Sequence, residues 1–368
     1  MSRCLELAKL GRGNTAPNPM VGSVLVYDGR IIGEGYHQQY GKAHAEVNCI
    51  ASVAETDQKL IPQSTLYVSL EPCTHFGKTP PCADLIIKQK IPRVIVGCRD
   101  PFKEVDGKGI EKLLAAGIDV VNGIMENECK DLNKRFFTFH TKHRPYIILK
   151  WAETADGFIA APSKPPPKGE AYEDADNGKA VPDRLHISNE YSNRLVHKWR
   201  SEEAAILIGT NTALMDNPEL TTRLWPGRSP VRLVLDMNLR LPAHLKIFNR
   251  EVRTIVFNSI KEGEDNGLVY SQLNKDAPVI DQMMDALYRL NIQSVLVEGG
   301  AKMLQSFIDV ETWDELRVVA NQLLKLRPDE GEALPAPLQP DAIQTAETKF
   351  ENDIIKLFKP KERWSPTS

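Results

Sequence analysis

The sequence predicts an α/β protein with two domains. A chain of 368 residues is longer than one hydrophobic core usually organises. Apolar runs typical of strands alternate with helical patterns along most of the chain, which is typical of α/β layers. A helical, basic and aromatic segment ends at residues 142–145, and a strand pattern follows Pro145. We therefore expect domains at 1–144 and 145–368.

The first domain begins with a hairpin pattern. The dipeptide Asp28-Gly29 separates two apolar runs and favours a two-residue turn. Glycine and proline mark the ends of most later segments. We expect strands over 21–26, 30–35, 65–70, 93–97 and 118–121, and helices over 43–54, 82–88 and 109–116.

The second domain also shows alternating strand and helix patterns. The stretch 160–182 is rich in Pro, Lys, Gly, Asp and Glu, a composition that buries too little apolar area to order itself, so we predict a mobile surface loop. We expect strands over 146–149, 205–208, 231–235, 254–257, 294–297 and 316–319, and helices over 193–199, 281–289 and 301–308.

Charge and composition narrow the class of partner. Lys plus Arg number 46 against 49 Asp plus Glu, so no positive field attracts nucleic acid. Charges at Arg3, Glu6 and Lys9 argue against a secretory signal, and no apolar run is long enough to cross a bilayer. We predict a cytoplasmic enzyme with a small-molecule substrate and with no nucleic-acid or membrane partner. Whether it forms a homo-oligomer is left open.

The strongest local pattern is typical of a catalytic zinc site. His44-Ala45-Glu46 precedes Pro72-Cys73, and Cys82 follows after eight intervening residues. One imidazole and two thiolates leave the fourth zinc position to water, which zinc makes a usable hydroxide near neutral pH. Glu46 is then the expected proton shuttle. The six cysteines do not form the pattern of a disulfide framework.

Two interpretations of this pattern remain open at the level of the residues. Zinc deaminases carry His-x-Glu and Pro-Cys-x-x-Cys, whereas the cysteine spacing here is wider. The alternative is a structural zinc site in the first half and a nucleotide-binding regulatory domain in the second half. Glu46 would then have no role. His75, Lys78 and Thr79 between the cysteines offer donors for a phosphate, or they form an ordinary solvated loop.

Two segments of the second half suggest ligand binding. Residues 297–301, Val-Glu-Gly-Gly-Ala, join a strand to a helix whose N-terminus can hold a phosphate, although a plain turn fits equally well. The polar segment 216–223 follows a helix that carries His197 and Arg200. Arg223 in this segment and Arg200 near it could bind a phosphate through paired N–H donors, or they could form a solvated, salt-bridged surface.

The first half closely resembles a known family. Residues 15–22 (Thr-Ala-Pro-Asn-Pro-Met-Val-Gly), 35–37, 44–46 and 71–82 (Glu-Pro-Cys-Thr-His-Phe-Gly-Lys-Thr-Pro-Pro-Cys) resemble the deaminase half of the bifunctional riboflavin-biosynthesis deaminase/reductases. The resemblance implies a cytidine-deaminase-like α/β/α domain that hydrolytically removes the ring amine of a diaminohydroxyphosphoribosylaminopyrimidine. It implies Zn²⁺ on His44, Cys73 and Cys82, with Glu46 catalytic, and substrate contacts from Asn18, His37, His75, Lys78 and Thr79.

The second half resembles the reductase half of the same family, which is similar in fold to dihydrofolate reductase. The resemblance rests on the order of Lys150, Thr154, Asp156, Gly157, Arg200, Gly209, Thr212, 216–223 and 298–300. It implies NADPH-dependent reduction of the ribosyl group to a ribityl chain, without identifying the proton donor. The implied cofactor residues are Ala152, His186, Thr212, Asp216, Gly300, Ala301, Lys302, Met303, Leu304, Gln305 and Ser306, and the implied substrate residues are Arg184, Arg200, Leu220, Arg223 and Glu298.

Some segments depart from the family pattern. The 160–182 stretch looks longer than usual, residues 184–188 replace a segment that commonly carries tryptophan, and 321–337 matches poorly. The rival prediction is a zinc deaminase of nucleosides or RNA with an unrelated second domain. Balanced charge and the Pro-Pro-Cys loop argue against it, because an RNA-binding enzyme would carry a basic face.

Overall fold

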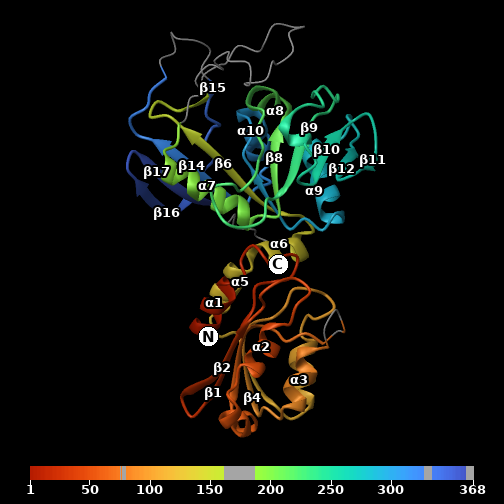
Figure 1. The fold of residues 1–368 in the computed structure, drawn as a ribbon, viewed down its shortest axis with the longest axis vertical. Helices are drawn as coiled ribbons and strands as arrows, with labels where there is room; N and C mark the ends of the chain where they lie inside the picture. Colours follow the sequence, from red (N-terminus) through yellow and green to blue (C-terminus); the bar gives the residue numbers. More distant parts are fainter. Residues whose placement is uncertain (75, 77–79, 161–186, 327–333, 362–368) are drawn as a thin grey trace. The chain divides into compact units, whose positions relative to one another are not determined.

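The computed structural model describes residues 1–74, 76, 80–160, 187–326 and 334–361. The chain divides into two compact units, Met1–Pro145 and Tyr146–Ser368 (Figure 1). Apart from Ala160, the predicted mobile loop lies outside the described residues. Within the part of the chain that is described, no helix is both long and apolar enough to cross a lipid bilayer.

The first unit is built on a five-stranded mixed sheet in the order β2-β1-β3-β4-β5. The pairs β2/β1 and β1/β3 are antiparallel, whereas β3/β4 and β4/β5 are parallel. The predicted hairpin is confirmed, with Asp28 and Gly29 both at positive φ, as its two-residue turn requires. The strands are β1 (Gly22–Tyr27), β2 (Arg30–Tyr36), β3 (Thr65–Leu70), β4 (Arg93–Cys98) and β5 (Asp119–Asn122).

Helices cover both faces of this sheet. On one face Ile86 and Leu113 pack with Leu66 and Val94, and on the other Cys4 and Leu7 pack against Val24. The predicted helix over 43–54 is confirmed only for its middle, because a 3-10 segment, η1 (Glu55–Gln63), follows. The helices are α1 (Ser2–Lys9), α2 (Ala45–Ala51), α3 (Cys82–Lys88), α4 (Lys108–Ala115), α5 (Glu126–Leu132) and α6 (Lys134–Lys142).

The second unit contains a ten-stranded sheet in the order β11-β12-β10-β9-β8-β13-β6-β14-β17-β16. From β12 to β14 every neighbouring pair is parallel, and the outer strands are antiparallel. The strands are β6 (Tyr146–Glu153), β8 (Ala205–Gly209), β9 (Val231–Leu235), β10 (Thr254–Asn258), β11 (Gly263–Asp265), β12 (Leu268–Gln272), β13 (Ser294–Val297), β14 (Glu315–Asn321), β16 (Ala342–Phe350) and β17 (Asp353–Pro360). A separate pair joins β7 (Phe158–Ala160) to β15 (Leu334–Pro335).

Helices also cover both faces of the large sheet, so the predicted α/β class is confirmed in both units. Met283 and Phe307 pack in the largest core cluster, whereas Val196 and Trp199 belong to a different cluster with Ile148. The parallel strands all end at one edge, where open α/β sheets commonly bind ligands. The helices are α7 (Glu190–Glu202), α8 (Thr210–Asp216), α9 (Val279–Arg289) and α10 (Ala301–Asp309), with the 3-10 turn η3 (Lys246–Phe248).

Candidate active sites

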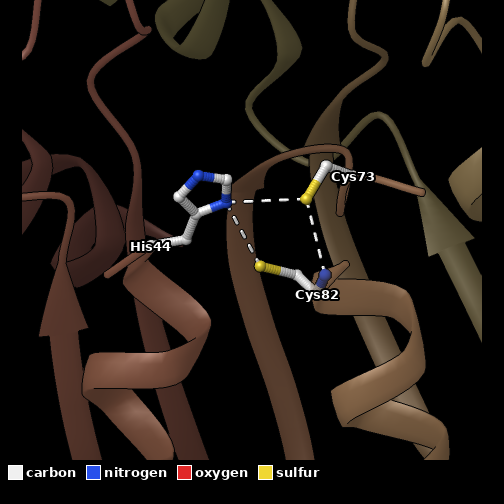
Figure 2. Close-up of side chains that lie close together, drawn as sticks. All are labelled: His44, Cys73 and Cys82. Atoms are coloured by element: carbon white, nitrogen blue, oxygen red, sulfur yellow. Dashed lines mark hydrogen bonds between the residues drawn. The ribbon is translucent and has the colours of Figure 1, made fainter. Parts of the chain in front are cut away.

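The predicted metal ligands of the first unit converge. The ligand atoms of His44, Cys73 and Cys82 all lie within 4.8 Å of one another. His44 Nδ1 lies 3.5 Å from Cys73 Sγ and 3.4 Å from Cys82 Sγ (Figure 2). One imidazole and two thiols are a donor set that suits zinc, and among the described residues this group has only three members. The residues present therefore fit a zinc ion with one position left for water.

The ends of secondary structure place these side chains. His44 is the N-cap residue of α2, Cys73 follows the end of β3, and Cys82 is the first residue of α3. The backbone N–H of Cys82 donates to Cys73 Sγ at 3.4 Å. The hydrogen bond from the Cys82 thiol, with a further contribution from His44, lowers the pKa of Cys73 to about 4. The site therefore favours one thiolate, on Cys73, whereas the hydrogen bond to Cys73 and burial raise the pKa of Cys82.

Glu46 lies in the first turn of α2, two residues beyond His44. Its side chain is almost fully enclosed, with 3% exposed. Burial, with a smaller contribution from Cys73, raises the pKa of Glu46 to about 7. A carboxyl group whose pKa lies near neutrality can both accept and return a proton at physiological pH.

Asn18 and His37 lie beside the metal ligands. The His37 ring packs edge-on against His44, with ring centroids 5.4 Å apart. Its Nδ1 lies 3.0 Å from the carbonyl oxygen of Ala43, and its Nε2 lies 3.1 Å from Asn18 Nδ2. Both nitrogens of this buried ring are thus engaged, so His37 supports the segment before His44. The three other predicted contacts, His75, Lys78 and Thr79, lie outside the described residues.

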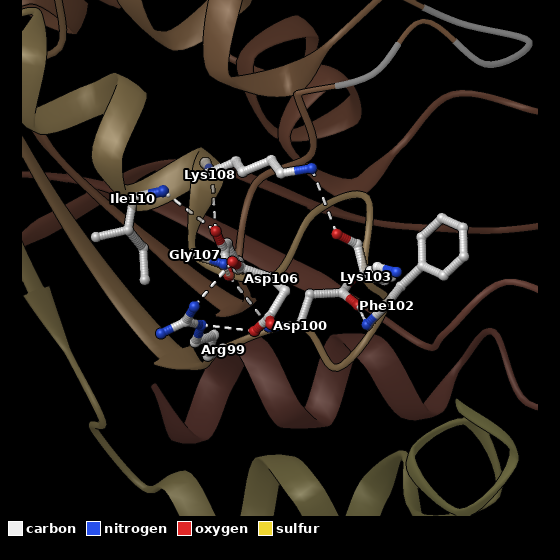
Figure 3. A network of polar contacts seen from close by, with 10 residues as sticks. Arg99, Asp100, Phe102, Lys103, Asp106, Gly107, Lys108 and Ile110 are labelled. Atoms are coloured by element: carbon white, nitrogen blue, oxygen red, sulfur yellow. Dashed lines mark hydrogen bonds and ion pairs between the residues drawn. The ribbon is translucent and has the colours of Figure 1, made fainter. Parts of the chain in front are cut away.

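A buried carboxylate, which the sequence motif contained without indicating a role, stabilises the segment that carries Cys73. Glu71 lies two residues before Cys73, and 4% of it is exposed. It accepts hydrogen bonds from backbone N–H groups at both ends of a loop that Figure 3 shows from Arg99 to Ile110. These donors are Asp100 at 3.2 Å, Gly107 at 3.0 Å, Gly109 at 2.8 Å and Ile110 at 3.2 Å.

This loop approaches the cysteine segment too closely for a side chain. A Cβ on Gly109 would lie 2.0 Å from the carbonyl oxygen of Pro72. Arg99 closes the loop by pairing with Asp106 at 2.7 Å. Burial raises the pKa of Asp100 to about 7, with smaller contributions from Glu71 and Cys73. The loop and the cysteine segment therefore form one tightly packed structure beside the metal ligands.

The second unit contains a cleft of about 1130 Å³. Its walls include residues at the carboxyl ends of β6, β8, β9 and β13. Of the predicted cofactor residues, Gln305 does not line it, because its amide bonds to Asp309 at 2.7 Å and to the backbone N–H of Leu338 at 2.9 Å. His186 lies outside the described residues. The others do line it: Ala152, Thr212, Asp216, Gly300, Ala301, Lys302, Met303, Leu304 and Ser306.

The glycine turn before α10 is packed closely against neighbouring protein atoms. Gly299 packs against Ile208, where an added Cβ would lie 2.6 Å from the Ile208 Cβ. Gly300 has a φ of 67°, and its missing Cβ would lie 3.2 Å from Thr212 Oγ1. The turn therefore brings bare backbone to the start of α10, where exposed N–H groups favour a phosphate.

A smaller cavity of about 220 Å³ adjoins the cleft. Four of the five predicted substrate residues line it, namely Arg200, Leu220, Arg223 and Glu298. Arg184, the fifth, lies outside the described residues. The two cavities share Thr212, Asp216 and Glu298. A cofactor and a second ligand would therefore meet at these three residues.

Glu298 in this shared wall forms a largely enclosed ion pair with Arg200, with 13% of the Arg200 side chain and 8% of the Glu298 side chain exposed. Arg200 donates to both carboxylate oxygens of Glu298, at 2.9 Å and 2.7 Å, and to the carbonyl oxygen of Thr221 at 3.3 Å. Burial opposes ionisation of Glu298, but the guanidinium of Arg200 prevails and lowers its pKa to about 2. Burial also lowers the pKa of Lys150, which lines the cleft near this pair. The resemblance included Lys150 but gave it no role.

Two family models match the two halves of the chain. The RibD C-terminal domain matches residues 145–324. The cytidine and deoxycytidylate deaminase zinc-binding region matches residues 1–98. A nucleoside or RNA deaminase with an unrelated second domain is therefore not favoured.

Curated proteins and solved structures agree with these matches over nearly the whole chain. Riboflavin biosynthesis protein RibD of Aquifex aeolicus is 39% identical, covering 86% of this chain and 85% of that protein. RibD of Escherichia coli is 34% identical, covering 88% and 87%. The crystal structure of a diaminohydroxyphosphoribosylaminopyrimidine deaminase/5-amino-6-(5-phosphoribosylamino)uracil reductase from Thermotoga maritima is 36% identical, with a TM-score of 0.83 over 98% of this chain and 97% of that one. The chain therefore belongs to the RibD family of riboflavin-biosynthesis enzymes, which join a zinc-dependent deaminase to an NADPH-dependent reductase.

Proposed function

We propose that Met1–Pro145 carries the deaminase and Tyr146–Ser368 the reductase, and that they act in turn on one phosphorylated pyrimidine. The substrate is 2,5-diamino-6-(5-phosphoribosylamino)pyrimidin-4-one. The first unit replaces its ring amine by oxygen, and the second reduces the ribosyl group to a ribityl chain. The observation that carries the proposal is the convergence of His44, Cys73 and Cys82 within 4.8 Å beside the buried Glu46.

In the first unit, His44, Cys73 and Cys82 would hold zinc. When bound, zinc supplies a water that ionises near neutral pH and attacks the ring carbon. Glu46 would accept a proton at its carboxylate and pass it to the leaving amine, while the second proton of the attacking water moves to the adjacent ring nitrogen, so that ammonia departs and a ring carbonyl remains. Asn18 and His37 remain predicted contacts to the substrate, and His37 also packs against the ring of His44. His75, Lys78 and Thr79 remain predicted contacts to the substrate phosphate.

In the second unit, NADPH supplies the hydride and the chain positions it. The predicted cofactor residues that line the large cleft hold it. Gln305, whose amide is bonded to Asp309 and Leu338, and His186 remain predicted contacts. The substrate occupies the smaller cavity, where Arg223 meets its phosphate, with Arg184 as a further predicted contact. The paired Arg200 and Glu298 form a fixed polar wall at the ribose. The hydride would reach the anomeric carbon of the ribose as the bond from that carbon to the ring oxygen breaks. Lys150 lines the cleft near this wall, and we assign it to protonate that oxygen.

A two-channel assay tests this proposal. The diaminopyrimidine phosphate is supplied with and without NADPH, while ammonia and cofactor absorbance are followed separately. In Cys82→Ser we expect loss of bound zinc and of ammonia release, because only two ligands remain. NADPH oxidation on substrate that has already been deaminated should continue, since its residues lie in the other unit. Loss of both activities would contradict two independent sites.

Location and association are also part of the proposal. We propose a cytoplasmic location. The nearly balanced charge of 46 basic and 49 acidic residues argues against binding to nucleic acid or to anionic membranes. Light scattering would show whether the protein forms a homo-oligomer. Retention of the protein on heparin or on anionic vesicles at physiological salt would contradict the absence of such partners.

A further inference from the structure

A buried arginine of the second unit has no part in the proposed chemistry. Arg232 lies on β9, and only 1% of it is exposed. Its Nη1 donates to Asn249 Oδ1 at 2.6 Å and to the carbonyl oxygens of Ile247 at 3.3 Å and Lys246 at 3.4 Å. All three acceptors belong to η3 or to the residue that ends it. The guanidinium therefore binds η3 from within the core.

The contacts of Arg232 are a poor means of stabilising the core. Among the described residues neither its Nε nor its Nη2 has a hydrogen-bond acceptor, and burying a charge with unpaired donors costs free energy. The carbonyl oxygen of Ile247 also accepts from Thr254 Oγ1 at 2.9 Å. Asn249 Oδ1 also accepts from the backbone N–H of Glu251 at 3.2 Å. Since these oxygens have a second donor, the distinctive contribution of the guanidinium is to fix the position of η3.

The turn η3 in turn supports the loop 217–223, which contributes to the wall of the smaller cavity. The backbone N–H of Lys246 donates to Asn217 Oδ1 at 2.7 Å. Leu220 is buried and packs in one core cluster with Leu245, the residue before η3. Asn217 and Leu220 have φ angles of 37° and 56°, in the left-handed region that residues other than glycine rarely adopt. A loop with two such residues keeps its shape only while the surrounding contacts stabilise it.

We propose that Arg232 is a positioning residue of the smaller cavity, which through η3 holds the loop 217–223 in the shape that binds the substrate. This inference rests on the proposed role of that cavity in the reductase step. Arg223, which is assigned to the substrate phosphate, ends the loop and lines the cavity. A shift of η3 moves Asn217 and Leu220, and with them the place of Arg223. Misplacing a positioned group by about 1 Å can reduce the rate of a reaction about 100-fold.

Two substitutions in the full-length protein interrupt this connection at its two ends. Arg232→Met removes the guanidinium and keeps apolar bulk, whereas Asn217→Gly removes the acceptor amide and keeps a backbone that tolerates positive φ. We expect each to raise the KM for the deaminated substrate about tenfold and to leave the KM for NADPH unchanged, because the loop 217–223 alone is displaced. The urea midpoint of the second unit should not fall in Arg232→Met, since an apolar residue avoids the cost of burying a charge. Arg232→Lys, which retains a donor, should recover part of the affinity for the substrate.

A double-mutant cycle separates positioning from a general structural effect. If Arg232 acts through η3 and Asn217, the double change should raise the KM for the substrate no further than either single change. Effects that multiply, a lowered urea midpoint, or a KM that rises for NADPH as well would assign Arg232 a general structural role and overturn the inference. Arg253→Met, which changes an exposed arginine directly before the neighbouring strand β10, is the matched control and should alter neither KM. If the unaltered protein does not reduce the deaminated substrate, the proposed function of the second unit fails instead.

Discussion

The metal centre and the cleft are built in different ways. The metal centre draws its three ligands from one helix N-cap, one strand end and one helix start, and a short motif specifies it almost completely. The cleft draws its walls from four parallel strands, and its central pair joins Arg200 to Glu298 across 98 positions. The comparison shows that a metal site can be recognised from local spacing, whereas a site at a sheet edge is assembled only by the topology.

The largest expected effect separates proton transfer from metal binding in the first unit. Glu46→Gln should keep zinc, because Glu46 is not one of the three ligands. Ammonia release should fall about 10² to 10⁴-fold, since the proton shuttle is lost. Measured zinc content and the rate of ammonia release check both parts. A variant that stays active would leave Glu46 without the role that we assign to it, and reduction of the deaminated substrate serves as the control.

The next effect concerns stability at the wall of the cleft. Arg200→Met leaves the carboxylate of Glu298 buried without its partner, which should cost about 3–5 kcal/mol in the free energy of unfolding of the second unit. Denaturant unfolding followed by tryptophan fluorescence measures it. The double change Arg200→Met with Glu298→Leu should recover part of the loss, because the carboxylate is removed together with its partner, whereas Lys150 then loses the nearby charge of Glu298. If the double change is as unstable as the single one, packing of Arg200 rather than its charge stabilises the unit.

A smaller effect tests how far the metal centre depends on its surroundings. Glu71→Gln replaces an acceptor of four backbone N–H groups by an amide that can accept with only one oxygen. We expect zinc affinity to fall about tenfold to 100-fold, as for other groups that orient ligands. Competition with a chelator measures the affinity, and the charge-transfer absorption of the cobalt-substituted protein reports the thiolate geometry. Glu104→Gln, a change on the exposed side of the same loop, is the control and should leave both readings unchanged.

The smallest expected effect is a pH dependence of the second unit. Burial, together with the charges of Arg200 and Arg223, lowers the pKa of His197 to about 4 from its ordinary 6.5. As the pH falls through 6.5, His197 therefore becomes protonated in the unfolded chain but not in the folded unit. The free energy of unfolding consequently declines until about pH 4. We expect the decline to be about 1–3 kcal/mol, measured by denaturant unfolding at several pH values. His197→Gln should flatten this part of the profile, and an equal slope in that variant would assign the effect to other groups.

Much of the fold was predictable from the sequence. The elements and contacts that were not predicted were missed for physical reasons. Strands such as β4 and β8 are nearly continuous apolar runs, so their patterns were clear. The edge strand β16 was missed because almost every residue in it is exposed, which removes the alternation that marks a half-buried strand. Glu71 stands inside a recognised motif, yet its role depends on a loop some 30 to 40 positions away. Such pairings arise from the tertiary fold and leave no local pattern.

The three residues common to both cavities have a thermodynamic consequence. Thr212, Asp216 and Glu298 line both the large cleft and the smaller cavity, which are the proposed sites of the dinucleotide and of the sugar phosphate. Any adjustment that one ligand imposes on them alters the free energy with which the other binds. Because such coupling is reciprocal, whatever factor NADPH contributes to substrate affinity the substrate must return to NADPH.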